Sequence, residues 1–173
     1  VLITSGMDLE QFSSGKPALD DWLKEHSLQA RGSGTANTFV LQNSNGEAGG
    51  YYSLSMGSIF HNEATERIRK GTGCHQISVL LLARLAVDLK FQGQGIGRAL
   101  LRDAVIRGVD ISMNVAFRQI ITRPIDENAA NFYRKYKFEP SPILPDHLMI
   151  LVKDTRKELG IPNIASQSRV VEK

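Results

Sequence analysis

The sequence predicts one α+β domain at residues 1–153, with a mixed, mostly antiparallel sheet flanked by helices, and a polar C-terminal tail at 154–173. Two short β-rich segments are joined by Asn43-Ser-Asn-Gly46, whose residue types tolerate positive φ and favour a hairpin turn. A long apolar run at 75–87 enters a glycine-rich turn and is followed by helical spacing. The 173 residues contain no internal repeat and no linker, so they suit one hydrophobic core.

The N-terminal half favours one long helix and a hairpin. Pro17 suits a first helical turn and the apolar residues after it share one face, so we expect a helix over about 16–31. Strands are expected at 38–42 and 49–56, on either side of the turn. A short charged helix at 63–70 precedes the long apolar run, which has the length and β-branched content of a buried strand.

Residues 92–97 read Gln-Gly-Gln-Gly-Ile-Gly, between the apolar run and the next helical pattern. A strand, a glycine-rich turn and a helix aim several backbone N–H groups at one point, where the positive end of the helix dipole also lies. Glycines at 93, 95 and 97 lack the Cβ atoms that would hold a pyrophosphate away from those amides. The segment predicts a phosphate-binding loop; a glycine-rich connection without a ligand is the alternative.

Two common phosphate loops do not fit this segment. A Walker A loop needs Lys-Ser or Lys-Thr after its glycines, and neither dipeptide follows here. A dinucleotide fingerprint needs Gly-x-Gly-x-x-Gly in the first βα unit, with an acid at the end of the next strand. This loop lies in mid-chain, and the next strand ends in Arg123-Pro124.

A second candidate element lies at 126–138. Asp126 is a good N-cap, and Ala129, Phe132, Tyr133 and Tyr136 recur at helical intervals. Strands are expected on either side, at 118–122 and 147–153. From about Asp154 the chain becomes polar and loses its periodicity, so we assign these residues to a C-terminal tail whose order the sequence does not determine.

The charge distribution favours an anionic substrate such as nucleic acid. Between Arg98 and Lys137 there are eight basic residues and four acidic ones, on the helices that flank the candidate loop. Solvated helix faces carry similar charge, and from charge alone this explanation is equally good.

Several classes of protein are not indicated. No apolar run is long enough to span a membrane, and no secretory signal is visible, so we expect a cytoplasmic protein. Cys74 is the only cysteine, which excludes an intramolecular disulfide; we assign it no catalytic role. The four histidines are scattered and no cysteine pair exists, so no metal site is expected. We expect packing or surface roles, and not the role of general base, for His61, His75 and His147.

Both candidate elements resemble motifs of the GNAT superfamily of N-acetyltransferases. Residues 92–97 match the Gln/Arg-x-x-Gly-x-Gly/Ala loop that binds the pyrophosphate of acetyl-coenzyme A (acetyl-CoA). The helix at 126–138 is similar to the Asn-x-x-Ala-x-x-Phe-Tyr-x-x-x-Gly-Phe signature. Position 137, usually glycine, is lysine here, which puts the tightness of the C-terminal turn of that helix in question.

The resemblance implies acetyl-CoA as co-substrate, no metal, and a set of site residues. Tyr133 would be the general acid for the departing thiolate, and Tyr136 is the neighbouring phenol to test beside it. A general base is not evident, because an α-amine with a pKa near 8 is partly neutral without help. The residues expected to bind the cofactor are Leu85, Ala86, Val87, Gln92, Gly93, Gln94, Gly95, Ile96, Gly97, Arg98, Asn128 and Asn131.

A narrower resemblance covers roughly residues 8–153. Phe12-x-Ser-Gly-x-x-x-Leu-Asp-x-Trp-Leu and Ala83-Arg-Leu-Ala-Val-Asp are similar to segments of the GNAT toxins of bacterial toxin–antitoxin operons. This implies acetylation of the α-amine of aminoacyl-tRNA, which blocks translation. It also implies a homodimer and a ribbon-helix-helix antitoxin through which the complex would contact operator DNA. Arg98, Lys135 and Lys137 are the candidates for contacts to the tRNA.

Two other classes of function stay open on the sequence. One is a GNAT enzyme acting on a small-molecule or protein amine, which would favour an acidic or aromatic acceptor pocket. The other is a non-catalytic acetyl-CoA sensor, in which Tyr133 would have no chemical role.

Overall fold

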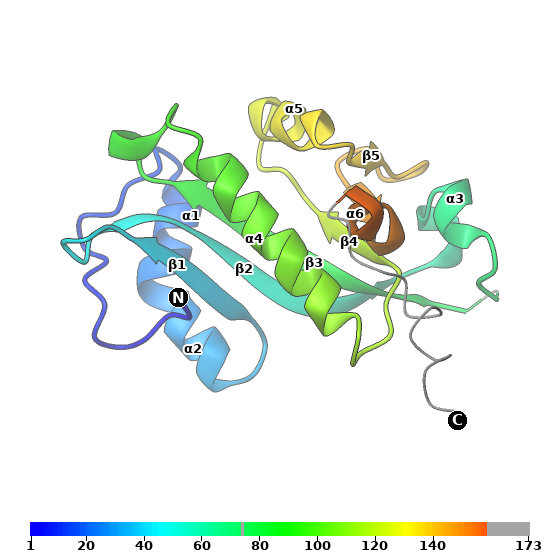
Figure 1. Cartoon of the computed structure of the whole chain (residues 1–173), viewed down its shortest axis with the longest axis horizontal. Coiled ribbons are helices and arrows are strands. Elements are labelled where there is room, and N and C mark those ends of the chain that lie inside the picture. Colours follow the sequence, from blue (N-terminus) through cyan, green and yellow to red (C-terminus); the bar gives the residue numbers. More distant parts are fainter. Residues whose placement is uncertain (74, 159–173) are drawn as a thin grey trace, which may run out of the picture. The chain divides into compact units, whose positions relative to one another are not determined.

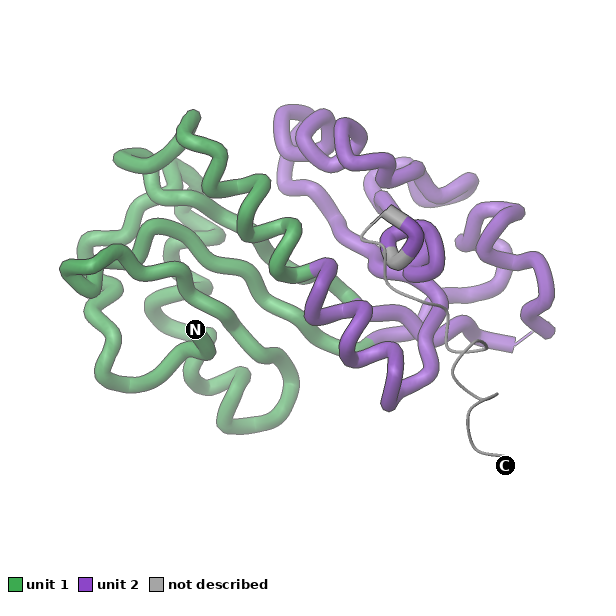
Figure 2. Tube along the Cα trace, viewed as in Figure 1, with its two compact units in different colours: residues 1–56, 81–104 green, residues 57–80, 105–173 purple. Residues whose placement is uncertain are grey.

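The computed structural model describes residues 1–73 and 75–158 (Figure 1). The chain forms two compact units, coloured separately in Figure 2. Unit 1 comprises residues 1–56 and 81–104, and unit 2 comprises residues 57–80 and 105 onward. Cys74 and residues 159–173, which include most of the predicted tail, lie outside the described residues.

Six strands form the sheet, in the order β1-β2-β3-β4-β6-β5. Antiparallel pairs join β1 to β2, β4 to β6, and β5 to β6. The predicted hairpin is present: Gly46 has φ 84°, and the Asn43 side chain accepts hydrogen bonds from the backbone of Asn45 and Glu47. The α+β class is confirmed. The strands are β1 Asn37–Gln42, β2 Ala48–Ile59, β3 Ile77–Val87, β4 Gln119–Thr122, β5 Glu139–Pro140 and β6 Leu148–Leu151.

The helices follow the predicted order. Near the N-terminus the expected helix is present, but a π-helical turn, η1 Trp22–His26, separates α1 Pro17–Asp21 from α2 Ser27–Gly32. The expected charged helix is reduced to a 3-10 turn, η2 His61–Glu63, and α3 Glu66–Arg69. The remaining helical elements are η3 Leu89–Phe91, α4 Ile96–Ile111, α5 Glu127–Lys135 and α6 Val152–Glu158.

The C-terminal prediction was wrong at one point. The strand expected at 147–153 ends at Leu151, and helix α6 occupies the last two residues of that expected strand and the first residues of the polar tail. Val152 and Thr155 are buried, and the Thr155 hydroxyl donates to the Val152 carbonyl at 2.7 Å. A helix of seven residues buries too few apolar side chains to produce a clear helical period in the sequence.

Unit 1 packs its core around the first two strands and the N-terminal helices. Tyr51 and Leu23 are fully buried, and Phe12 meets the Tyr51 ring edge-on with 5.7 Å between ring centroids. Gly50 lies where a Cβ atom would come within 2.8 Å of Leu100 on α4 and 2.9 Å of the Ala86 carbonyl oxygen. Glycine therefore allows β2, β3 and α4 to approach closely beside the start of the candidate loop.

Unit 2 has a core of its own on β4, β6 and α5. Ile120, Leu148 and Met149 are almost fully buried. Gly108 on α4 permits close packing, since a Cβ atom there would come within 2.9 Å of Leu80 and 3.0 Å of Ile120. In the part of the chain that the structure describes, no helix combines the length and the apolar character needed to cross a bilayer.

Replacing Gly50 by alanine should destabilise the protein by about 1–3 kcal/mol, because the new methyl group overpacks the contact with the Ala86 carbonyl and Leu100. The matched control is Gly6→Ala, since no heavy atom lies within 4 Å of a Cβ built there. Urea denaturation of both variants measures the difference. Equal midpoints for the two variants would contradict this account of the packing.

Candidate functional site

The candidate loop starts from a buried carboxylate. Asp88 directly follows β3 and is only 3% exposed. Its side chain accepts hydrogen bonds from the backbone N–H groups of Ser13 at 2.9 Å and Lys90 at 2.8 Å. The Asp88 N–H donates to the Gly49 carbonyl at 3.1 Å. The end of β3 is thereby fixed to both β2 and the N-terminal segment.

Two glycines give the loop its shape. Gly93 has φ 76° and Gly95 has φ 82°, in the left-handed region that other residues rarely adopt. A Cβ atom at either position would meet nothing within 4 Å, so this side of the loop is open. The Ala99 N–H donates to the Gly95 carbonyl at 3.1 Å, which begins the first turn of α4. An open, Cβ-free bend at the N-terminus of a 16-residue helix fits a pyrophosphate group.

The side chains of both glutamines in the loop bind the protein itself. The Gln92 amide donates to the carbonyls of Val87 at 3.0 Å and Ser14 at 3.1 Å. The Gln94 amide donates to the Lys90 carbonyl at 3.1 Å. These side-chain hydrogen bonds hold the loop in its conformation. Because the side-chain amides are engaged in them, Gln92 and Gln94 can bind a ligand through their backbone groups. Of the other predicted ligands here, Ala86 is buried, Leu85, Val87, Ile96 and Gly97 are half-buried, and Arg98 is exposed.

The candidate acid, Tyr133, lies in unit 2 on α5. The helix begins as predicted, with the Asp126 side chain accepting from the Ala129 N–H at 2.8 Å. Tyr133 is 4% exposed, and its ring packs against Phe132 and Phe138 at centroid distances of 5.2 and 5.4 Å. Burial raises its pKa to about 12, while a hydrogen bond with Thr122 acts in the opposite direction. The phenol is therefore held in its protonated form.

The other predicted residues of this helix lie on its outer face. Asn128, Asn131 and Lys135 are exposed, and the Asn131 carbonyl oxygen accepts from Arg134 at 3.1 Å. Tyr136 is half-buried against Phe132, with 5.2 Å between ring centroids. The structure thus distinguishes the two neighbouring phenols by burial.

Lys137 occupies the strained turn that the sequence indicated. Its φ is 64°, and among the described residues it is the one non-glycine residue with a positive φ. Its N–H donates to the Arg134 carbonyl at 3.0 Å, and the Phe138 N–H donates to the Tyr133 carbonyl at 3.4 Å. Left-handed backbone at a helix C-terminus costs a non-glycine residue about 1 kcal/mol.

One feature of unit 1 was not predicted as part of a site. The Arg84 guanidinium stacks on the Trp22 indole, with its Cζ atom 3.5 Å from the ring centroid. Desolvation lowers the pKa of Arg84, and within residues 1–73 and 75–158 no carboxylate is bonded to it. Arg84 and Trp22 both lie in the segments that resemble the toxins. This resemblance is the feature of the sequence that could have drawn attention to the pair.

The histidines do not form a metal site. His147 is buried and its Nδ1 atom lies 2.9 Å from an Asp146 carboxylate oxygen. His61 lies in η2, and His75 lines a surface hollow beside Arg118. Across the described ranges, no group of three or more histidine, cysteine, aspartate or glutamate side chains is placed to hold a metal ion.

The Tyr133 phenol should ionise at a higher pH in the folded protein than in the unfolded protein. Because the fold favours the neutral phenol, the stability that this residue contributes is present below about pH 10 and is lost as the pH rises toward 12. At about pH 10.5, the phenolate absorbance of folded wild type and Tyr133→Phe should agree; in denaturant, the wild type should show the additional ionised tyrosine. A clear difference between the two folded proteins would contradict the burial of this phenol.

The part of the chain that holds both candidate elements matches a known family. The model of the acetyltransferase (GNAT) domain matches residues 34–140. A tRNA-acetylating toxin of Mycobacterium tuberculosis (strain ATCC 25618 / H37Rv) is 40% identical over 158 residues, which cover 91% of this chain and 94% of that protein.

Solved structures show the same fold. AtaT complexed with acetyl-methionyl-tRNAfMet matches with a TM-score of 0.85 and 22% identity, over 92% of this chain and 97% of that chain. AtaTR bound with AcCoA matches with a TM-score of 0.80 and 23% identity, over 91% of this chain and 95% of that chain. A KacTA–DNA complex matches with a TM-score of 0.78 and 22% identity, over 92% and 96% of the two chains. The chain therefore belongs to the GNAT family of N-acetyltransferases, enzymes that take their acetyl group from acetyl-CoA.

Proposed function

We propose that the protein is an N-acetyltransferase toxin that moves the acetyl group of acetyl-CoA to the α-amine of aminoacyl-tRNA and so blocks translation. The observation that carries the proposal is the 40% identity, over 91% of the chain, with a protein named as a tRNA-acetylating toxin. The open loop at Gly93 and Gly95 supports acetyl-CoA as the donor, because it leaves room for a pyrophosphate against backbone amides.

The cofactor would be held mainly by backbone groups of unit 1. The amides of residues 93–97 would bind the pyrophosphate, with Arg98 beside them on the first turn of α4. Leu85, Ala86 and Val87, at the end of β3, would bond the pantetheine arm as an added strand. One of their N–H groups would polarise the thioester carbonyl. The resemblance also assigns Asn128 and Asn131, which are exposed on α5, to hydrogen bonds with the arm or a phosphate.

Acetyl transfer forms a C–N bond, breaks the C–S bond, and moves one proton from the amine to the thiolate. An α-amine has a pKa near 8, so part of it is neutral at physiological pH and needs no strong base. The buried Tyr133 phenol stays protonated and would donate to the sulfur as negative charge develops there. A thiol has a pKa of about 8.5, below that of the phenol, so Tyr133 must recover a proton from the amine as it gives one up.

The proposed partners follow from the same relationship. An antitoxin of the ribbon-helix-helix type would neutralise the enzyme, and operator DNA would be bound through the toxin–antitoxin complex. Solved relatives include AtaT bound to the C-terminus of the antitoxin AtaR and a KacTA–DNA complex. We further propose a cytoplasmic homodimer of one GNAT domain, residues 1–153, in each chain.

Incubation with acetyl-CoA and a set of charged tRNAs, followed by mass spectrometry of the released aminoacyl-adenosine, should show N-acetylation by the wild type. Tyr133→Phe should bind acetyl-CoA normally and react about 10²- to 10⁴-fold more slowly, since only the proton donor is lost. Tyr136→Phe is the matched control, because Tyr136 is the C-cap residue of the same helix, and it should retain its rate. Reaction with labelled peptides or polyamines, but not with charged tRNA, would refute the toxin assignment.

Gly95→Glu should abolish acetyl-CoA binding, with a loss of about 100-fold or more. The carboxylate would lie against the phosphates, and like charges brought together cost several kcal/mol. Gly34→Glu is the control, because Gly34 also has a positive φ, 71°, and open space around it, but lies outside the loop. Isothermal titration calorimetry compares the two variants. Unchanged affinity of the Gly95 variant would place the cofactor elsewhere.

A further inference from the structure

Lys137 lies at a position where glycine would suit the backbone better. The turn that ends α5 requires a left-handed residue, and Lys137 adopts φ 64° to make it. The GNAT signature that this helix resembles has glycine at the same position. A strained residue that persists where an unstrained one is available indicates a use for its side chain.

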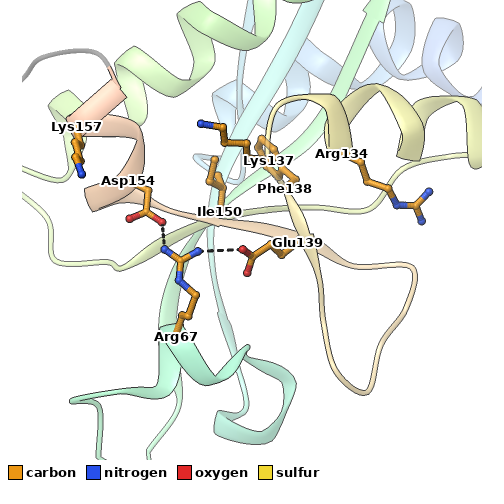
Figure 3. Close-up of a pocket in the computed structure, with 8 residues that line it drawn as sticks. All are labelled: Arg67, Arg134, Lys137, Phe138, Glu139, Ile150, Asp154 and Lys157. Carbon is orange, nitrogen blue, oxygen red and sulfur yellow. Dashed lines mark hydrogen bonds and ion pairs between the residues drawn. The ribbon is translucent and has the colours of Figure 1, made fainter.

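The Lys137 side chain lines a pocket of about 750 Å³ within unit 2 (Figure 3). The pocket lies among the end of α5, β5, β6, α3 and α6. Its lining holds four basic and two acidic residues, and one of the basic residues, Arg134, is paired with Glu127 outside the lining at 2.5 Å. The lining therefore keeps a small excess of positive charge. The lining residues are Arg67, Arg134, Lys137, Phe138, Glu139, Ile150, Asp154 and Lys157.

A single guanidinium binds both acidic side chains of the pocket. Arg67 lies between them, with Nη1 at 3.0 Å from Glu139 and Nη2 at 2.5 Å from Asp154 (Figure 3). The two carboxylates raise the pKa of Arg67 through hydrogen bonds and charge, so it stays ionised. Arg67 therefore offsets part of the negative charge that would otherwise repel an anion from Lys137 and Lys157.

We infer that this pocket, which we call the Lys137 pocket, binds a phosphate of the RNA backbone of the substrate. Lysine binds phosphate as a point charge, without the geometric demands of base recognition. Phe138, the one aromatic residue of the lining, is only 3% exposed and offers no face on which a base could stack. The contact is therefore with the backbone and independent of sequence. This inference rests on the proposed tRNA substrate and names a place where that RNA is held.

The test is a variant whose effects on stability and binding have opposite signs. Lys137→Gly relieves the backbone strain, so its thermal unfolding midpoint should rise by about 2–4 °C. The same variant removes one cation, so its affinity for uncharged tRNA should fall, and the slope of log K against log salt should decrease by about 1. Fluorescence anisotropy of the full chain at several salt concentrations measures the affinity for tRNA and its salt slope. Thermal denaturation measures the unfolding midpoint.

Three further variants separate charge from backbone. Lys137→Arg keeps the cation and should retain wild-type affinity and salt slope. Lys157→Ala removes a cation of the same pocket and should reduce the slope without the gain in stability. Lys153→Ala is the control on α6, because Lys153 is exposed and does not line the pocket, and its slope should equal that of the wild type.

The inference is overturned if Lys137→Gly gains stability but keeps wild-type affinity for tRNA and an unchanged salt slope. It is also overturned if the variant weakens binding of inorganic phosphate or of an acidic antitoxin peptide while tRNA binding is unaffected. The acetylation assay on charged tRNA tests the proposed function independently of this inference. A wild type that binds RNA through Lys137 but does not acetylate charged tRNA would refute the proposed function and leave the inference about phosphate binding standing.

Discussion

The buried carboxylate of Asp88 is the interaction on which the candidate cofactor site depends. It joins the end of β3 to Ser13, which is 75 residues away in the sequence, and it fixes Lys90 at the start of the loop. A carboxylate that is 3% exposed is stabilised by hydrogen bonds such as these two backbone donors, and its removal would leave both donors unsatisfied. The Gln92 amide continues the same connection by bonding Ser14 and Val87. The open side of Gly93 and Gly95 is thus positioned by contacts that involve no ligand.

The two parts of the proposed chemistry differ in their surroundings. The candidate cofactor loop presents backbone amides on an exposed bend, so the binding that we propose for it is that of a helix N-terminus and depends little on side chains. Tyr133 is enclosed by Phe132 and Phe138, and that apolar packing keeps its phenol protonated. A phenol that stays protonated can serve as the general acid of the proposed reaction.

Lys137 combines an unfavourable backbone conformation with a favourable position for charge. Its left-handed φ reduces stability, while its side chain adds to the positive charge of the Lys137 pocket. Local strain that persists at a site of function is a common compromise between stability and activity. Arg67 supports the same pocket differently, because it engages Glu139 and Asp154 and so joins α3, β5 and α6.

The sequence by itself determined the α+β class, the hairpin, the glycine loop and the helix that carries Tyr133. These features depend on local rules: Asn43 and Gly46 favour a turn, the glycines at 93 and 95 permit positive φ, and Asp126 caps a helix. The resemblance to GNAT enzymes rested on those same segments, and the comparisons confirmed the family. The assignments of individual site residues stay predictions.

Only the tertiary structure decided which side chains of these segments are available to a ligand. The inward hydrogen bonds of Gln92, the stacking of Arg84 on Trp22 and the burial of Tyr133 all join residues from different elements. Helix α6 and the Lys137 pocket likewise depend on contacts among α3, β5 and β6. Periodicity and residue type report a segment's own conformation, whereas burial, pKa and pocket charge arise from neighbours that are distant in the chain.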